Sequence, residues 1–219
     1  MKLIKPSFKI VRMTSDPLKL IEEAGRLCYQ SEPNETTQEA FIRARIRQGH
    51  ESILEHASMS VMFITDRGVT HEEVRHRLCA YSQESTRWCD YEGKEMEFVI
   101  PPWCDIHEGV YHMDSNVKFN CNNDEEWFNL MLDSELSYIE LRTNGWKPEQ
   151  ARSVLPISLK TSILHTANLR EWRHILNLRA AGKAGRPHPQ MREIMIPLLL
   201  EVKKLIPVIF EDIEPYKGE

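Results

Sequence analysis

A cationic segment follows the first third of the chain: Arg75-His76-Arg77-Leu78-Cys79-Ala80-Tyr81-Ser82-Gln83-Glu84-Ser85-Thr86-Arg87-Trp88. It contains three arginines and one histidine but a single acidic residue. Arginine offers five donors in a planar fork that matches phosphate or carboxylate, and it stays charged at any physiological pH. The segment therefore favours a phosphorylated ligand. A solvated helix face, where charge clusters are common, is the alternative that these residues leave open.

The sequence on either side of these cations predicts how they are presented. Val69–Val74 has the Thr-x-x-Glu pattern of a capping box, which predicts a short helix that ends within the cationic segment. From Cys79 to Trp88 helix signals are weak, so we expect extended chain. Because side chains alternate along a strand, Gln83, Ser85 and Arg87 would then share one face.

Composition excludes several classes of protein. The chain has 219 residues, 41% of them hydrophobic, which is enough for a core and is typical of one domain. A net charge of -5 argues against a general nucleic-acid binder. Five cysteines form no Cys-x-x-Cys pair, and the sequence shows no signal peptide or membrane span. We expect a cytoplasmic protein in a reducing compartment, without a membrane or a nucleic-acid polymer as partner.

Periodicity and turn residues predict alternating helices and strands. Apolar spacing and capping residues indicate helices near 17–28, 38–48, 127–142, 148–155, 168–179 and 191–206. Apolar, β-prone runs indicate strands near 57–65, 96–100 and 157–167. We expect Cys28 on the core face of the first helix and Leu130 on that of the long one. One compact α+β domain over residues 1–219 follows.

Two familiar kinds of site are absent from the sequence. His50 and His56 are six residues apart, whereas the zincin motif needs two histidines four apart on one helical face, so we expect no metal site. The chain also lacks a Gly-x-Gly-x-x-Gly turn and a Gly-x-x-x-x-Gly-Lys loop. Any nucleotide must therefore be held by side chains and irregular backbone.

Four motifs, in order along the chain, resemble those of the flavin-dependent thymidylate synthases. They are Arg-His-Arg followed after seven residues by Ser85, His50-Glu51-Ser52-Ile53-Leu54-Glu55-His56, Ala151-Arg152-Ser153-Val154-Leu155-Pro156, and Asn168 to Arg179 followed by His188-Pro189-Gln190. Four ordered motifs are far more specific than one tripeptide. The resemblance implies a single domain in which an antiparallel or mixed β-sheet is flanked by helices.

The resemblance also implies an activity. Members of this family convert dUMP to dTMP with 5,10-methylenetetrahydrofolate as one-carbon donor and NADPH-reduced FAD as hydride source. The flavin supplies the hydride and the protein supplies position and electrostatics, so no cysteine nucleophile is required. Family sites are assembled between subunits, which implies a homotetramer.

Residue roles follow from the same resemblance. Arg179 would be catalytic and would stabilise negative charge on the uracil of dUMP. The implied dUMP site is Glu72, Arg75, Gln83, Glu84, Ser85, Thr86, Arg87, Arg152 and Arg179. The implied FAD site is Ser52, Arg75, His76, Arg77, Gln83, Asn168, Arg170 and His174, with His188 and Gln190 as further contacts. Cys28 lies where the family has a small residue near the substrate.

Two departures from the family pattern keep other functions open. Many members read Ser-x-Asn-Glu-x-Ser where this chain reads Ala80-Tyr81-Ser82-Gln83-Glu84-Ser85. Glu72 stands where some members have glutamine, and an acid there repels phosphate unless it is paired or turned away.

One alternative function is that of a nucleotide- or RNA-binding module that uses the same arginines. Another is a flavin-binding member that has lost synthase activity.

Overall fold

The computed structural model describes residues 1–218, which fall into two compact units. Each unit is built from separate stretches of the chain. Unit 1 comprises Met1–Ser7, Phe63–Glu73 and Ser82–Ile163, and unit 2 comprises Phe8–Met62, Val74–Tyr81 and the chain from Leu164 onward. The cationic segment is therefore divided, with its Arg-His-Arg part in unit 2 and its Ser85–Arg87 part in unit 1.

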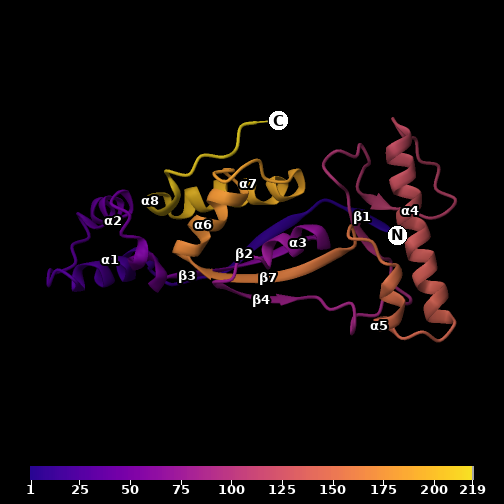
Figure 1. Cartoon of the computed structure of the whole chain (residues 1–219), viewed down its shortest axis with the longest axis horizontal. Helices are drawn as coiled ribbons and strands as arrows, with labels where there is room; N and C mark the ends of the chain where they lie inside the picture. Colours follow the sequence, from indigo (N-terminus) through magenta and orange to yellow (C-terminus); the bar gives the residue numbers. More distant parts are fainter. Residues whose placement is uncertain (219) are drawn as a thin grey trace. The chain divides into compact units, whose positions relative to one another are not determined.

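A four-stranded sheet has the strand order β2-β3-β7-β4 (Figure 1). Its strands are β2 (Ser7–Met13), β3 (Ser58–Asp66), β7 (Lys160–Asn168) and β4 (Cys79–Gln83). Every second residue is buried along most of β3 and along β7, as expected where one face of a sheet packs on a core. The strands predicted at 57–65 and 157–167 are confirmed, although the second begins three residues later than expected.

Within unit 1, a three-stranded sheet has the order β5-β1-β6. The central strand β1 (Lys2–Ile4) pairs in parallel with β5 (Glu97–Val99) and antiparallel with β6 (Gly109–Val110). The long helix α4 (Asn122–Thr143) supplies Phe128, Met131 and Tyr138 to the same apolar core. Mixed strands flanked by helices confirm the predicted α+β class.

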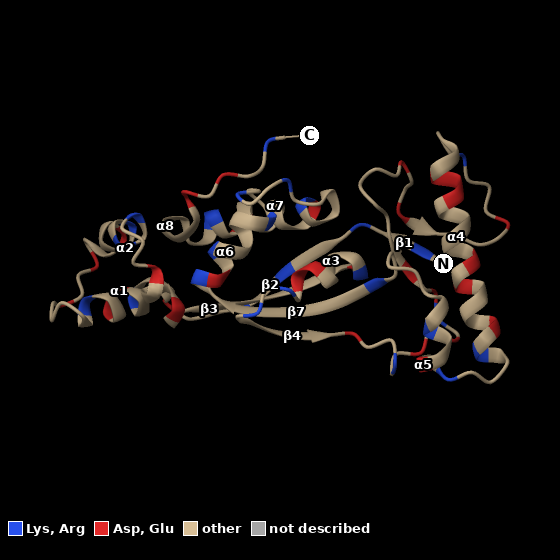
Figure 2. Ribbon diagram, in the orientation of Figure 1, with Lys and Arg blue, Asp and Glu red and all other residues tan. Residues whose placement is uncertain are grey.

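Acidic residues outnumber basic ones along α4 (Figure 2). Six of its residues are aspartate or glutamate, of which Asp124 and Glu135 are buried, and one is arginine. Leu130 is 52% exposed, so its predicted place on the apolar face is wrong, because Phe128 and Met131 fill the core positions on either side. An anion bound to unit 1 must therefore rely on cations outside this helix.

Helix α3 (Arg67–Glu73) lies in unit 1 and begins two residues before the predicted helix. The Asp66 carboxylate accepts a hydrogen bond from the backbone N–H of Val69 at 2.8 Å. Thr70 lies inside the helix and its hydroxyl donates to the carbonyl of Arg67 at 3.1 Å. The capping box predicted at Thr70 is therefore wrong, because Asp66 at the end of β3 caps the helix.

Strand β4 ends at Gln83, which is earlier than expected. The chain turns at Ser85, whose carbonyl accepts from the N–H of Cys89 at 2.8 Å and whose hydroxyl accepts from the N–H of Arg87 at 3.3 Å. Serine side chains favour such turns because they bond to nearby backbone. The predicted strand face shared by Gln83, Ser85 and Arg87 is therefore not formed. The short helices α5 (Pro148–Ala151) and η2 (Arg152–Val154) complete unit 1.

In unit 2, the helices predicted at 17–28, 38–48, 168–179 and 191–206 are confirmed to within two residues at either end. Unit 2 also contains short helices that were not predicted. Its helices are α1 (Pro17–Leu27), α2 (Gln38–Arg47), η1 (Glu51–His56), α6 (Leu169–Arg179), α7 (Pro189–Leu205) and α8 (Pro207–Phe210). Pro17 occupies the first turn of α1, and Gly49 follows α2 with a φ of 75° that glycine adopts readily. Cys28 is exposed, so its predicted core position is wrong, because α1 ends at Leu27. Among residues 1–218, no helix combines the length and apolar character needed to cross a bilayer.

Candidate functional site

Helix α6 presents a polar face in unit 2. The Asn168 side chain caps it by accepting a hydrogen bond from the backbone N–H of Glu171 at 2.8 Å. Trp172, Ile175 and Leu176 are fully buried, which gives α6 one apolar face. The helical period then sends Arg170 and His174 to the opposite side, where both are exposed.

An open cavity of about 730 Å³ lies along this polar face. Its lining is mostly charged or polar: Glu51, Glu55, Leu78, Asn168, Arg170, Glu171, Arg173, His174 and Asn177. Cavities of about 300–1,000 Å³ are typical for small molecules and cofactors. The cavity therefore brings together three residues of the implied FAD site, namely Asn168, Arg170 and His174.

The two arginines of this cavity have different surroundings. Arg173 is 4% exposed and bonds to Glu51, the carbonyl of Ile209 and both carboxylate oxygens of Asp212. Arg170 is exposed and pairs with Glu55 at 2.5 Å. Because a buried arginine with full hydrogen bonding holds the fold together, Arg170 is the cation that a ligand can recruit.

His76 is buried beside the cavity residues of α6. Its carbonyl accepts from the Tyr81 hydroxyl at 3.0 Å, and its ring meets that of His174 edge to face, with 6.0 Å between centroids. The Nε2 atom of His76 accepts a hydrogen bond from Arg179 Nε at 3.2 Å. Burial lowers the pKa of His76 to about 4, and the charges of Arg179 and His174 add to that shift. His76 is therefore neutral at neutral pH.

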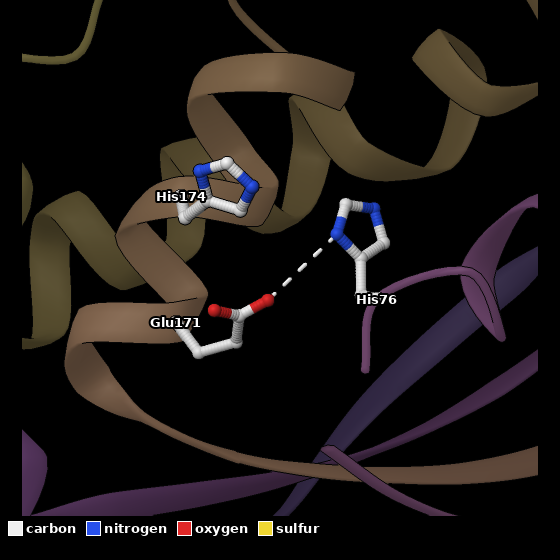
Figure 3. Close-up of side chains that lie close together, drawn as sticks. All are labelled: His76, Glu171 and His174. Carbon is white, nitrogen blue, oxygen red and sulfur yellow. Dashed lines mark ion pairs between the residues drawn. The ribbon is translucent and has the colours of Figure 1, made fainter. Parts of the chain in front are cut away.

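The other ring nitrogen of His76 faces a carboxylate. Nδ1 lies 3.8 Å from Oε1 of Glu171 (Figure 3). Burial raises the pKa of Glu171, although the charges of His174 and Arg170 oppose that shift. Since His76 is neutral, this is a polar contact and not an ion pair. His76, Glu171 and His174 each place one donor atom within 4.8 Å of the others, which is a spacing that a metal ion could use.

The remaining residues of the implied FAD site are scattered over two environments. Ser52 is exposed in η1, where it lines a second cavity of about 270 Å³ with Cys28 and Arg170, so it shares this cavity with another implied FAD residue. Arg75 and Arg77 are exposed, and neither forms an ion pair with any residue among 1–218. Gln83 belongs to unit 1, unlike the others.

The implied phosphate site gathers in unit 1, around the turn at Ser85. Arg152 Nη1 donates to the Thr86 hydroxyl at 3.4 Å, which places the predicted residues Thr86 and Arg152 together. Arg87 Nε lies 3.9 Å from a carboxylate oxygen of Glu149, and both side chains are about half exposed. Exposed pairs of this kind are weak, so a bound phosphate could displace Glu149.

Gln83 and Glu84 are held in unit 1 by other residues. The Gln83 amide donates to the hydroxyls of Thr70 at 3.0 Å and Thr161 at 3.2 Å. Glu84 pairs with Lys160 at 3.1 Å, which reduces its repulsion of an anion. Glu72 is half-buried in α3. The remaining dUMP residues, Arg75 and Arg179, lie in unit 2.

Two of the five free cysteines are poor nucleophiles. Burial raises the pKa of both Cys79 and Cys104 to about 11, so these two thiols are protonated at neutral pH.

Sequence reasoning missed two acidic residues of the site. Glu171 is not among the predicted site residues, yet its side chain contacts His76. Its i, i+3 spacing to His174 is the signal that could have placed both on one face of the helix. Glu55 belongs to a quoted motif, but its pairing with Arg170 depends on residues that are far apart in the sequence.

Comparison with known proteins identifies the family of this chain. A family model described as thymidylate synthase complementing protein matches residues 9–208. Flavin-dependent thymidylate synthase of Mycobacterium sp. (strain JLS) is 33% identical over 216 residues, which cover 90% of this chain and 80% of the relative. The enzyme of the same name from Mycobacterium tuberculosis is 33% identical over 205 residues, covering 89% and 79%.

A solved structure shares the fold. The UMP/dUMP methylase PolB from Streptomyces cacaoi, bound with 5-Br dUMP, superposes with a TM-score of 0.78 over 96% of both chains at 22% identity. At this identity the similarity shows the fold alone. The family match covers most of the chain, and the two relatives agree with it. This chain therefore belongs to the thymidylate synthase complementing protein family.

Proposed function

We propose that this chain is a flavin-dependent thymidylate synthase, which methylates dUMP to dTMP with FAD as its cofactor. Family membership and two relatives at 33% identity support the activity. One structural observation carries the proposal furthest. Arg179 donates to neutral, buried His76, whose ring contacts Glu171 and His174 of the polar cavity of α6.

Unit 2 supplies the groups proposed to bind the flavin. They are Ser52, Arg75, His76, Arg77, Asn168, Arg170 and His174. The family resemblance also assigns Gln83 to the flavin. The chemistry of these residues fits FAD, because Arg75, Arg77 and Arg170 suit a pyrophosphate and Asn168 supplies an amide. When bound and reduced, the flavin supplies the hydride for the methyl group.

The proposed dUMP site separates phosphate binding from ring activation. Ser85, Thr86, Arg87 and Arg152 offer hydroxyl and guanidinium donors to the phosphate. Glu72, Gln83 and Glu84 border the nucleotide, and Arg75 contributes a further cation. Arg179 stabilises negative charge that develops on the uracil when its ring is attacked. No cysteine nucleophile takes part.

The further reactants and the assembly state are also part of this proposal. The one-carbon donor is 5,10-methylenetetrahydrofolate and the reductant of the flavin is NADPH. The protein is a cytoplasmic homotetramer whose sites are shared between subunits. Its five free cysteines suit a reducing compartment. Leu78 and Trp88, which are 74% and 79% exposed, are large apolar side chains of the kind that subunit contacts cover.

An absorbance titration tests the cofactor and substrate together. The purified protein should show flavin bands that NADPH bleaches under anaerobic conditions, and dUMP should alter the bleaching. With methylenetetrahydrofolate present, dTMP should form.

Light scattering tests the assembly state and should give the mass of four chains. A colourless protein that cannot be loaded with FAD and binds oligonucleotides in a salt-dependent way would instead be a nucleic-acid binder. Flavin binding without turnover would identify a member that has lost activity.

A further inference from the structure

Arg179 is held through its Nε atom. Nε adjoins the flexible methylene chain, so a hydrogen bond there fixes the plane of the guanidinium. The acceptor is Nε2 of His76, at 3.2 Å. His76 is 6% exposed, and the Tyr81 hydroxyl holds its carbonyl at 3.0 Å. A well-placed imidazole therefore determines where Arg179 points.

This hydrogen bond determines the tautomer of His76. Because Nε2 accepts a hydrogen bond from Arg179, it must carry a lone pair, and the ring proton of neutral His76 must lie on Nδ1. Nδ1 is the atom that faces Glu171 (Figure 3). A carboxylate near an N–H favours the tautomer that keeps the proton on that nitrogen.

Glu171 is well placed for this task. It lies in the first turn of α6, where a negative charge is stabilised by the helix dipole. Its side chain is about one-tenth exposed, so water screens its charge only partly. The backbone N–H of Glu171 bonds to the Asn168 cap, which fixes the turn that carries it.

A metal ion is the competing use of the same side chains. His76, Glu171 and His174 have a suitable spacing. A metal on Nδ1 of His76, however, needs the lone pair there and moves the ring proton to Nε2. That proton would then face the Nε proton of Arg179 across 3.2 Å. The hydrogen bond from Arg179 therefore favours a proton on Nδ1 over a metal.

We propose that Glu171 is a positioning residue, which acts through the imidazole of His76 to hold the guanidinium of Arg179 toward the nucleotide. This inference rests on the proposed function, because only that function makes the uracil of dUMP the group that Arg179 contacts. Glu171 itself touches neither flavin nor substrate in this proposal. Its negative charge selects the His76 tautomer that can accept from Arg179.

Glu171→Gln tests this role, because the substitution keeps size and removes charge. We expect flavin content to match that of the natural protein, kcat to fall about tenfold, and KM for dUMP to change less. Glu201→Gln is the matched control, since it removes a partly exposed charge on α7 that pairs only with Lys204 among the ion pairs of residues 1–218. Loss of flavin from the Glu171 variant would overturn the proposal in favour of direct flavin contact.

The double substitution with Arg179→Ala separates positioning from other effects. If Glu171 acts only through Arg179, then Glu171→Gln should lower the rate of dTMP formation no further once Arg179 is alanine. An equal loss in both backgrounds would show that Glu171 acts elsewhere.

Metal analysis and a Zn²⁺ titration test the competing metal site. One tightly bound ion per chain that is lost in the Glu171→Gln variant would establish a metal site and overturn the proposal.

Nitrogen NMR of histidine-labelled natural protein keeps the proposal testable even if the variant does not fold. The expected signal for His76 is that of a neutral ring with its proton on Nδ1 and none on Nε2. A proton on Nε2 would overturn the inference. This readout does not depend on turnover, so it distinguishes failure of the positioning role from failure of the synthase function.

Discussion

At the scale of single residues, Arg179 is the side chain on which the proposed chemistry depends. It is the last residue of α6, and its Nε is committed to His76. A cation at a helix C-terminus usually serves the helix dipole. Here the hydrogen bond to the buried, neutral imidazole of His76 also orients the guanidinium of Arg179. Arg179 can therefore serve the nucleotide as well as the helix dipole.

Replacing Arg179 should separate cofactor binding from catalysis. We predict that Arg179→Ala retains flavin but forms dTMP at least about 100-fold more slowly, because a preorganised donor to the developing charge is lost. Flavin absorbance and a turnover assay measure the two effects. Arg186→Ala, an exposed arginine of the following loop, serves as the control and should leave both unchanged. A fully active Arg179→Ala variant would remove this residue from the mechanism.

At the scale of elements, the N-terminus of α3 depends on one buried side chain. Asp66 is 2% exposed and caps the helix through Val69 N–H. We predict that Asp66→Ala lowers stability by about 1–2 kcal/mol. For a chain of this size, each kcal/mol corresponds to about 2–4 °C of melting temperature. Asp66→Asn keeps an acceptor, so thermal unfolding should show a smaller loss. Equal losses would mean that capping is not the role of Asp66.

The segment after Trp88 is joined to α4 through Asp90. Arg142 donates to both Asp90 carboxylate oxygens, at 3.0 and 2.6 Å, and chiefly these bonds lower the pKa of Asp90 from 3.8 to about 2. Below pH 4 the unfolded carboxyl takes up a proton before the folded one does, so acid favours unfolding. The stabilisation is complete above pH 4 and is lost as pH falls toward 2.

Melting curves of Asp90→Asn test this linkage. The variant should be less stable than the natural chain at pH 6, and the difference should close between about pH 4 and pH 2. Asp133→Asn, on the exposed side of α4, should show no such closing gap. A difference that stays constant down to pH 2 would contradict the role of the carboxylate charge.

At the scale of the whole molecule, the two compact units share strands. β3, β4 and β7 each contribute residues to both units. We propose that residues 1–219 therefore behave as one domain, because unfolding either unit would break strands that the other unit needs. Calorimetry should show a single unfolding transition. Its calorimetric enthalpy should equal its van't Hoff enthalpy, as expected when the whole chain unfolds as one cooperative unit. Two resolved transitions would show that the units are separate domains.

Local patterns in the sequence were enough to predict most elements and the chemistry of the site. The strand periodicity of 57–65, the Asn168 cap and the buried face of α6 depend on neighbours a few residues away, and all three are confirmed. Where one local signal failed, another residue nearby in the sequence competed with it. Asp66 replaced Thr70 as the cap, and the turn at Ser85 ended β4 early.

The sequence by itself determined the α+β class, the family motifs and the residue types able to bind a phosphorylated ligand, because these depend on local period and side-chain chemistry. Only the tertiary structure decided which residues meet. Glu171 and Arg179 lie on one helix, but His76 reaches them from almost a hundred residues earlier in the chain. A tautomer, a pKa and the direction of a guanidinium depend on such long-range contacts, burial and charge, which the order of residues does not reveal.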